Sequence, residues 1–166
     1  MRYSRTASLL VATGALTGAL TWSLCLRVES GDLAVPFPEG YRNWVHVKTT
    51  LVGPQSPAFA VNGGIHHFYA NEKALEGYRT GTFPDGAVLI DDLLETRENA
   101  GITSAGPRRR VAVMLKGAER YRETGGWGFE VFKSDGHDGS LTPEAAAGCF
   151  ACHEKARASV FSEFQP

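Results

Sequence analysis

The chain has 166 residues, of which 43% are hydrophobic, and its formal net charge is −1. These values fit one compact domain with an apolar core, which we place at residues 35–166. Seventeen basic residues are balanced by eighteen acidic ones, so the charge gives no reason to expect a nucleic-acid partner.

The first thirty residues have the pattern of an export segment. Arg2 and Arg5 precede an uncharged apolar run from Leu9 to Leu26, and this order is typical of a secretory signal peptide. The run also just reaches the length of a membrane span. Residues 1–30 are therefore either a cleaved signal peptide or an uncleaved anchor. Both interpretations predict a periplasmic protein that meets the inner membrane only through this segment.

The middle of the chain is dominated by strand-like runs. Short strand-like runs, of which the first alternates between apolar and polar residues, are separated by turns rich in Gly, Pro and Asp. The five predicted strands are NWVHVKTTLV, GIHHFYA, GAVLIDDLLE, RRRVAVMLK and GWGFEVFK. In the first of them we expect the odd-numbered residues from Val45 to Leu51 to share one face. Gly125-Gly126 is expected to form the turn before the last strand.

Two helices are predicted beside these strands. NEKALEGYR has Asn71 as a possible N-cap, and its Leu75 and Tyr78 fall on the inward side. A second helix is expected to begin near the C-terminus, where Thr142 can cap it and Pro143 suits its first turn. Strands closed by a helix indicate an α+β or mainly β domain.

The second helix carries the motif Cys-Phe-Ala-Cys-His, with Cys149, Cys152 and His153. A disulfide between residues three apart would close a very small loop and stabilise the fold weakly. A zinc site needs about four ligands, and the chain has no second Cys pair. A thioredoxin-like pair lies in a βαβ unit, and no strand pattern follows this one. The motif therefore predicts one covalently attached haem c, with both thiols bonded to the haem vinyl groups and His153 as the iron ligand.

The occupant of the sixth coordination position of the iron, opposite His153, decides between electron transfer and ligand binding. Met114 lies within a predicted strand and is expected to be core filler. His66 and His67 point to opposite faces of one strand, so at most one of them faces a haem, and we choose His66. His46 and His137 are expected at the surface. We expect an open sixth position, and the alternative is a six-coordinate electron carrier with His66 or Met114 as ligand.

The chain resembles the cytochrome P-460 family, which includes the P-460 enzymes and the cytochromes c′-beta. The similar stretches are GYRNWVHV, IHHFYANEKALEGYRTGTFPDGAVLI, VAVMLKGAERYRETGGWGFEVF and CFACHEKARASVFSEF, which cover nearly all of residues 40–164. The resemblance implies a mainly antiparallel sheet with a few helices, a haem-attachment helix at the C-terminal end and a five-coordinate c-type haem. It also implies a homodimer.

Three positions depart from the P-460 enzymes, which oxidise hydroxylamine with a haem cross-linked to a lysine. By resemblance, Asp91 stands where that lysine is expected, Ala112 replaces a pocket glutamate and His66 replaces a distal arginine. An aspartate cannot supply an amine cross-link and an alanine cannot take a proton. The chain is therefore more similar to the c′-beta side, where an unmodified haem binds gases such as nitric oxide.

The pockets of the c′-beta proteins are lined by phenylalanines. Phe68 is our first candidate, because it shares the strand face of His66, and Phe59 and Phe129 are the others. Asp91 is either a distal acid that works with His66 or an exposed residue at a strand end. The run Arg108–Arg110 is expected to be a solvated loop, with contact to haem propionates or to an acidic redox partner as the alternative.

Three functions follow from these features. The first is a haem protein that binds a small gaseous or nitrogenous ligand or exchanges electrons with a redox partner protein. The second is an enzyme that acts on hydroxylamine, nitric oxide or peroxide, with Asp91 and His66 as acid–base groups. The third is the six-coordinate electron carrier.

Overall fold

The computed structural model describes residues 33–164. The predicted export segment, residues 1–30, lies outside the described residues. Within residues 33–164, no helix is long and apolar enough to cross a membrane.

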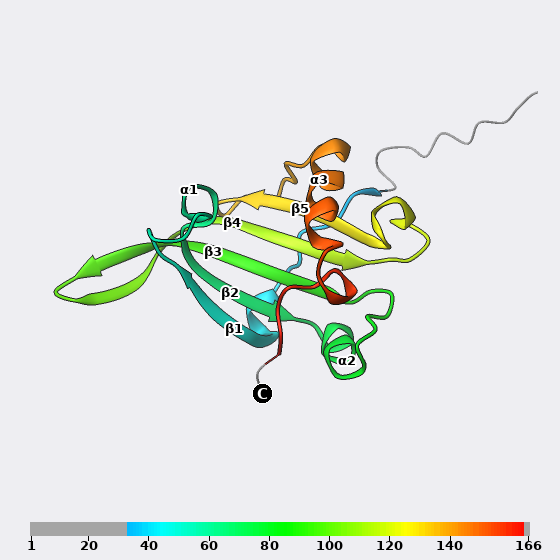
Figure 1. Ribbon diagram of the computed structural model, residues 1–166, viewed down its shortest axis with the longest axis horizontal. Helices are drawn as coiled ribbons and strands as arrows, with labels where there is room; N and C mark the ends of the chain where they lie inside the picture. Colours follow the sequence, from blue (N-terminus) through cyan, green and yellow to red (C-terminus); the bar gives the residue numbers. More distant parts are fainter. Residues whose placement is uncertain (1–32, 165–166) are drawn as a thin grey trace, which may run out of the picture.

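One five-stranded antiparallel sheet forms the centre of the protein (Figure 1). Its strands follow one another in chain order, each paired with the next. They are β1 (Val45–Val52), β2 (Gly64–Ala70), β3 (Val88–Asn99), β4 (Ile102–Lys116) and β5 (Trp127–Lys133). The predicted α+β class and all five strands are confirmed. Gly125 and Gly126 have φ angles of 65° and 78° and form the predicted turn before β5.

Three α-helices accompany the sheet: α1 (Phe59–Asn62), α2 (Glu72–Thr80) and α3 (Pro143–His153). Both predicted N-caps are confirmed, because Asn71 accepts from the backbone N–H of Ala74 and Thr142 accepts from that of Ala145. The short helix α1 was not predicted. Single 3-10 turns lie at Tyr41–Asn43, Arg122–Thr124 and Arg157–Ser159.

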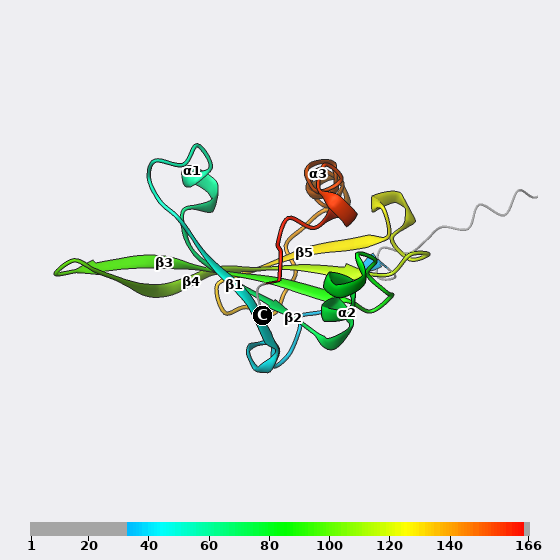
Figure 2. The ribbon, with the colours of Figure 1, turned by 60° about the horizontal axis from the view of Figure 1, so that its bottom comes forward.

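Figure 2 shows that α1 and α3 stand on the same side of the sheet. A cluster of buried side chains on this side includes Val47, Leu89, Trp127 and Phe129, and residues of α2 and α3 pack against it. A second cluster, on the opposite face, includes Ile90, Val111 and Phe132 and is covered by the segment that precedes β1. The alternation of Leu89 and Ile90 between the clusters follows from the two faces of a strand.

The expected face of β1 is wrong. The pairing with β2 shifts register between His46 and Lys48, so a bulge interrupts the alternation there. Val47 is buried in the first cluster, whereas Leu51 is 56% exposed. Alternation in the sequence could not reveal the bulge, because the extra residue is set by the pairing with β2.

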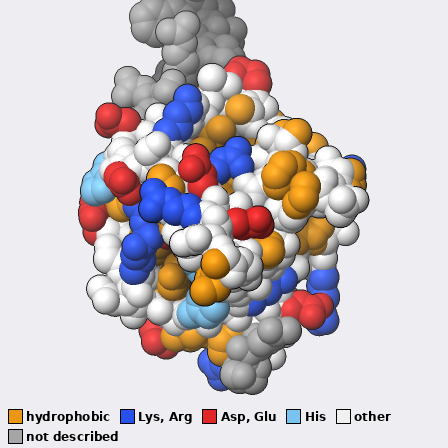
Figure 3. Space-filling view, turned by 90° about the vertical axis from the view of Figure 1, so that its left-hand side faces the viewer, with side chains coloured by type: hydrophobic (Ala, Val, Ile, Leu, Met, Phe, Trp, Pro, Cys, Tyr) orange, Lys and Arg blue, Asp and Glu red, His pale blue; other side chains and the backbone are white. Residues whose placement is uncertain are grey.

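β3 and β4 continue beyond the sheet as a two-stranded arm, seen at the left of Figure 1. Residues 95–105 of this arm are exposed. Seen from the end that carries the arm, the surface mixes basic and acidic side chains with small apolar areas (Figure 3).

Candidate functional site

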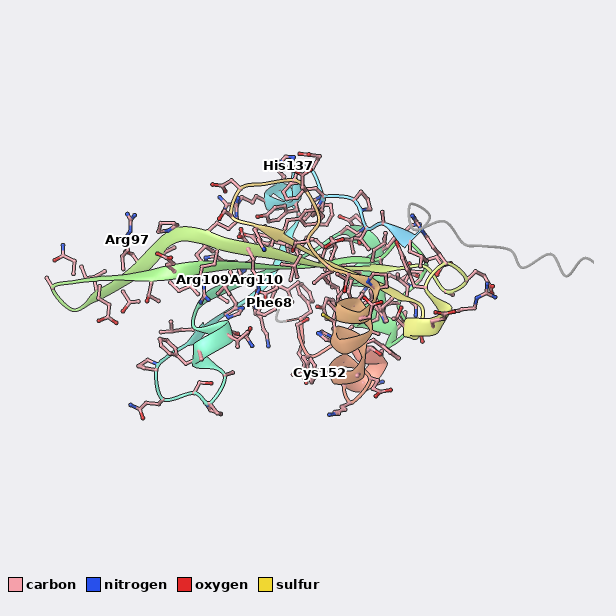
Figure 4. The ribbon with its side chains drawn as sticks, turned by 90° about the horizontal axis from the view of Figure 1, so that it is seen from above. Phe68, Arg97, Arg109, Arg110, His137 and Cys152 are labelled. Atoms are coloured by element: carbon pink, nitrogen blue, oxygen red, sulfur yellow. The ribbon has the colours of Figure 1, made fainter. Side chains whose placement is uncertain are left out.

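A cavity of about 550 Å³ is lined by residues of the sheet, of the segment around α1, of α3 and of the chain that follows α3. This volume is typical of small-molecule and cofactor sites, which measure roughly 300–1,000 Å³. Most of the predicted site residues line it. They are His66, Phe68, Asp91, Cys149 and His153. Cys152 is exposed instead, and Figure 4 shows it on α3, on the same side of the sheet as Phe68.

His153, the last residue of α3, lies in the cavity wall with its ring orientation fixed. Its Nδ1 lies 2.9 Å from the carbonyl oxygen of Ser159. Since a carbonyl only accepts, Nδ1 carries the proton and Nε2 keeps its lone pair. The ring also packs at 5.3 Å from Phe129 and at 5.0 Å from Phe161, between ring centroids. A carbonyl partner of this kind is the usual support of a metal-binding histidine.

The carbonyl of Ser159 reaches His153 because the chain turns sharply after α3. Ala158 and Ser159 have φ angles of 52° and 61°, in the left-handed region that residues with a side chain rarely adopt. The following residues, Val160 to Ser162, then return along the cavity wall.

Cys149 and Cys152 are three residues apart on α3 and form no disulfide with each other. Burial is the main cause that raises the pKa of the Cys149 thiol, and the neighbouring Cys152 adds to it. No residue of α3 is fully buried, although the helix is apolar on average. Cys149 and His153 are the residues of α3 that line the cavity, while Ala146, Cys149 and Phe150 pack against the first buried cluster.

His66 and Asp91 face each other across β2 and β3, with His66 Nδ1 at 2.8 and 3.0 Å from the two carboxylate oxygens. The other ring nitrogen, Nε2, lies 2.7 Å from the carbonyl oxygen of Asn62. Both partners are acceptors, so the arrangement is satisfied by the imidazolium form, which has a proton on each nitrogen. Burial by itself lowers the pKa of His66, but the hydrogen bond and the charge of Asp91 outweigh burial and raise that pKa.

The expected strand face is confirmed for Phe68, whose ring stacks on His66 at 6.0 Å between centroids. Phe129 and Met114 also line the cavity. Phe59 is 42% exposed and is not part of the cavity wall. Neither nitrogen of His66 has a lone pair free in this arrangement.

The prediction of a solvated loop at Arg108–Arg110 is wrong, because all three arginines lie in β4. Arg109 donates to the carbonyl oxygen of Gly63 at 2.5 Å. Arg110 donates to the carbonyl oxygen of Val61 at 3.3 Å and to Asn62 Oδ1 at 2.6 Å. These two side chains hold the end of α1 against the sheet, and long arginine stems allow this from within a strand.

Arg108 points to the other face, where it donates from Nε to Asp92 at 2.8 Å. Asp92 is fully buried and also accepts from Tyr41 at 2.7 Å and from Arg42 at 3.0 Å. Burial alone raises the pKa of Asp92, yet the hydrogen bonds from Arg108, Tyr41 and Arg42 bring it below its usual range. Asp91 and Asp92 are thus not an exposed acidic pair, because the strand sends them to opposite faces.

The remaining histidines lie away from the cavity. His46 and His67 share the hydroxyl of Thr49, at 2.9 and 2.8 Å, on the face opposite to His66. His137 stacks on Phe37 at 3.9 Å between centroids, on the side of the sheet opposite to Cys152 (Figure 4). In the described part of the chain, no group of three or more His, Cys, Asp or Glu side chains is placed to hold a metal ion.

Asn62 is the cavity residue that sequence reasoning missed. It precedes Gly63-Gly64, so it has the pattern of an ordinary turn residue. Its position in the cavity wall depends on α1 and on its contacts with His66, which is close in the chain, and with Arg110, which is distant.

Comparison with known protein families gives a match over most of the described chain. The family model described as Cytochrome P460 matches residues 38–162, which include the sheet, all three α-helices and every residue of the cavity wall. A comparison with individual curated proteins gives no match.

Proposed function

The chain belongs to the cytochrome P460 family, whose members are haem-binding cytochromes, and from this premise we propose that it carries one covalently attached haem c and binds a small diatomic ligand such as nitric oxide. Exchange of electrons with a redox partner protein is part of the same proposal. The observation that carries it is the hydrogen bond from His153 Nδ1 to the carbonyl of Ser159, which leaves Nε2 as a metal ligand.

The residues around the cavity fit a haem. Cys149 and Cys152 would hold it through thioether bonds, and His153 Nε2 would bind the iron. Phe68, Phe129 and Phe161 would supply apolar contact for the ring. When bound, the haem would supply an iron centre that takes up a small ligand or an electron.

An open sixth position is supported by the contacts of His66. Both of its ring nitrogens donate to other groups, to Asp91 and to the carbonyl of Asn62, so the ring would first have to lose both partners to bind iron. Met114 packs against the first buried cluster, as a core residue does. A ligand that enters the cavity would therefore meet no competing protein ligand.

Asp91 supports the c′-beta type rather than the hydroxylamine-oxidising type. It lines the cavity at the position where the resemblance expects a cross-linking lysine, and a carboxylate offers no amine. Its neighbour Ala112 pairs with it across β3 and β4 and supplies no acid or base.

The pairing of His66 with Asp91 favours an enzyme as the second candidate. A protonated imidazole in a cavity can donate a proton to a bound substrate, and an adjacent carboxylate can restore its charge. Hydroxylamine, nitric oxide and peroxide are the substrates to assay. Turnover that falls in Asp91→Asn and His66→Gln would establish this candidate.

We extend the proposal to location and assembly. The basic and apolar pattern of residues 1–30 supports export to the periplasm, with membrane contact only if this segment stays attached. A homodimer is proposed from the resemblance. Fractionation of cells and the mass of the purified holoprotein in solution test these two points.

The visible spectrum of the holoprotein, oxidised and reduced, with and without carbon monoxide, tests the main proposal. A broad high-spin reduced spectrum that sharpens with carbon monoxide is the expected result. Sharp low-spin bands that carbon monoxide does not change would mean a second protein ligand, with Met114 as the first residue to replace. A strongly red-shifted reduced band would mean a modified haem and would contradict the argument from Asp91.

A further inference from the structure

We propose that the side-chain amide of Asn62 is the hydrogen-bond donor to the ligand in the cavity, and that Arg110 orients this amide for the task. The inference deepens the proposed function, because it names a ligand-positioning residue for the same site. It rests on three observations: the bond that fixes the amide, the occupation of the neighbouring donors and the anchoring of the segment that carries Asn62.

The orientation of the amide follows from the chemistry of its partner. Arg110 Nη2 lies 2.6 Å from the end of the Asn62 side chain. A guanidinium has donors and no acceptor, so the atom that faces it must be the amide oxygen Oδ1. The amide nitrogen Nδ2 then points away from Arg110. No described residue accepts a hydrogen bond from Nδ2, and Asn62 lines the cavity.

The neighbouring polar groups are already engaged. His66 donates from Nδ1 to Asp91 and from Nε2 to the carbonyl of Asn62. Glu130 also lies in the cavity wall, but its carboxylate is an acceptor and not a donor. Its Oε1 accepts hydrogen bonds from the backbone N–H groups of Val131, Ser140 and Leu141. Thr50 lines the cavity as well. Its hydroxyl has no hydrogen-bond partner among the described residues, so Thr50 is the alternative donor that the test must exclude.

The end of α1 is held firmly enough to keep such a donor in place. Arg109 binds the carbonyl of Gly63, Arg110 binds that of Val61, and His66 binds that of Asn62 itself. Arg109 and Arg110, labelled in Figure 4, come from β4 and His66 comes from β2, so both strands anchor the segment. Charged donors make the stronger class of hydrogen bond, and a fixed donor needs no reorganisation when a ligand arrives.

This arrangement selects a class of ligand. An N–H donor favours a ligand whose free end carries negative charge and can accept a hydrogen bond, such as nitric oxide, dioxygen or nitrite. It gives less advantage to carbon monoxide, whose oxygen is a weak acceptor. The imidazolium of His66 and the guanidinium of Arg110, opposed here by Asp91, add a positive charge to this end of the cavity.

The test uses the full-length holoprotein, reduced and saturated with carbon monoxide, and reads the C–O stretching frequency by infrared spectroscopy. A donor near the oxygen lowers this frequency because it stabilises negative charge there. Asn62→Leu removes the donor at similar size. Asn62→Asp keeps an oxygen for Arg110 but places a second oxygen where Nδ2 was. Thr50→Val, on the same cavity, and Asn99→Leu, in the exposed arm, are the controls.

We expect a higher frequency in both Asn62 variants, with the larger shift in Asn62→Asp, and no shift in either control. Dissociation of nitric oxide should become roughly two- to tenfold faster in Asn62→Leu, as the loss of one hydrogen bond implies. Arg110→Met should shift the frequency in the same direction but less, since it releases the amide without removing it.

An unchanged frequency in Asn62→Leu would overturn the proposal. So would a shift in Thr50→Val of the size expected for Asn62→Leu, or a larger shift in Arg110→Met than in Asn62→Leu, because the donor would then be another residue. Asn62→Asp serves where Asn62→Leu does not fold. Failure of the proposed function is seen separately, as a wild-type protein that holds no haem or forms no carbon monoxide complex.

Discussion

The carbonyl oxygen of Ser159 lies 2.9 Å from Nδ1 of His153, six residues earlier in the chain. The bond closes a short loop directly after α3 and fixes the ring of the one histidine of the CxxCH motif. It depends on two consecutive residues with left-handed backbone, Ala158 and Ser159. The orientation of the proposed iron ligand is therefore set by the chain that follows the motif.

Because of this turn, we expect a substitution by glycine to stabilise the protein. A non-glycine residue in left-handed conformation costs about 1–2 kcal/mol, and the greater freedom of glycine in the unfolded chain takes back about 0.5–1 kcal/mol. Ala158→Gly should therefore raise the free energy of unfolding by roughly 0.5–1 kcal/mol, measured by denaturant titration. Ala156→Gly is the matched control, because Ala156 has an ordinary φ of −91°, and it should lower stability. Equal losses in both variants would contradict the turn.

The two cysteines and His153 should have separable roles. In the double variant Cys149→Ser with Cys152→Ser, acidified organic solvent should extract the haem, because no thioether remains. Each single variant should retain the haem through one bond. His153→Ala should keep the haem attached but change its visible spectrum, because only the iron ligand is lost. Extraction of the haem from the wild-type protein would refute covalent attachment.

His66 should make stability depend on pH above neutrality. Asp91 raises the pKa of His66 above its ordinary value of about 6.5, against burial and against the nearby charge of Arg110. Folding therefore favours the protonated ring. The stabilisation of the folded state by the protonated His66 ring is complete below pH ~6.5. It is lost as the pH rises through the raised pKa of the folded state.

The free energy of unfolding, followed from pH 6 upward at constant salt, checks this sign. The wild-type protein should lose stability over the window above pH ~6.5, and His66→Gln should lose that dependence. His66→Gln should also be less stable below this window by roughly 1–3 kcal/mol, because it leaves Asp91 without its charged partner. The exposed His137 supplies the control, since His137→Gln should keep the slope. A slope that survives in His66→Gln would assign it to another group.

Arg108 should contribute more to stability than its position in a run of three arginines suggests. It is 14% exposed in its side chain and pairs with Asp92, whose side chain is 0% exposed. Arg108→Met leaves this buried carboxylate with Arg42 and Tyr41 as its remaining partners, so the cost is that of one lost charged hydrogen-bond partner, about 1–3 kcal/mol, and not that of a fully uncompensated buried charge. Arg108→Met should therefore lower the free energy of unfolding by about that amount. Arg97→Met, in the exposed arm, should change it by less than about 0.5 kcal/mol, and similar effects in the two variants would mean that the pair is solvated.

The elements that the sequence predicts well depend on local signals. Strand-like runs bounded by turns located all five strands, Asn71 and Thr142 marked the starts of α2 and α3, and Gly125-Gly126 marked a turn. Each of these signals lies within a few residues of the structure that it specifies. The resemblance to a haem family rests on similarly local stretches and is confirmed over residues 38–162.

The predictions that failed, or were never made, depend on partners distant in the chain. The bulge in β1 is a property of its pairing with β2. Three consecutive arginines resemble a solvated loop until the buried Asp92 and the carbonyl groups at the end of α1 are seen beside them. Asn62 resembles a turn residue, and only the contact with Arg110 reveals which way its amide points. A local sequence pattern does not show contacts between residues that are distant in the chain.

The partial exposure of every residue of α3 has a consequence for how the protein unfolds. An eleven-residue helix is marginal in water by itself, and α3 follows all five strands without adding a strand to the sheet. Without haem, α3 should therefore melt at a lower temperature than the sheet, in two separate transitions. Bound haem would touch both parts and merge them into one cooperative transition, so that the cofactor determines whether the domain unfolds as one unit or as two.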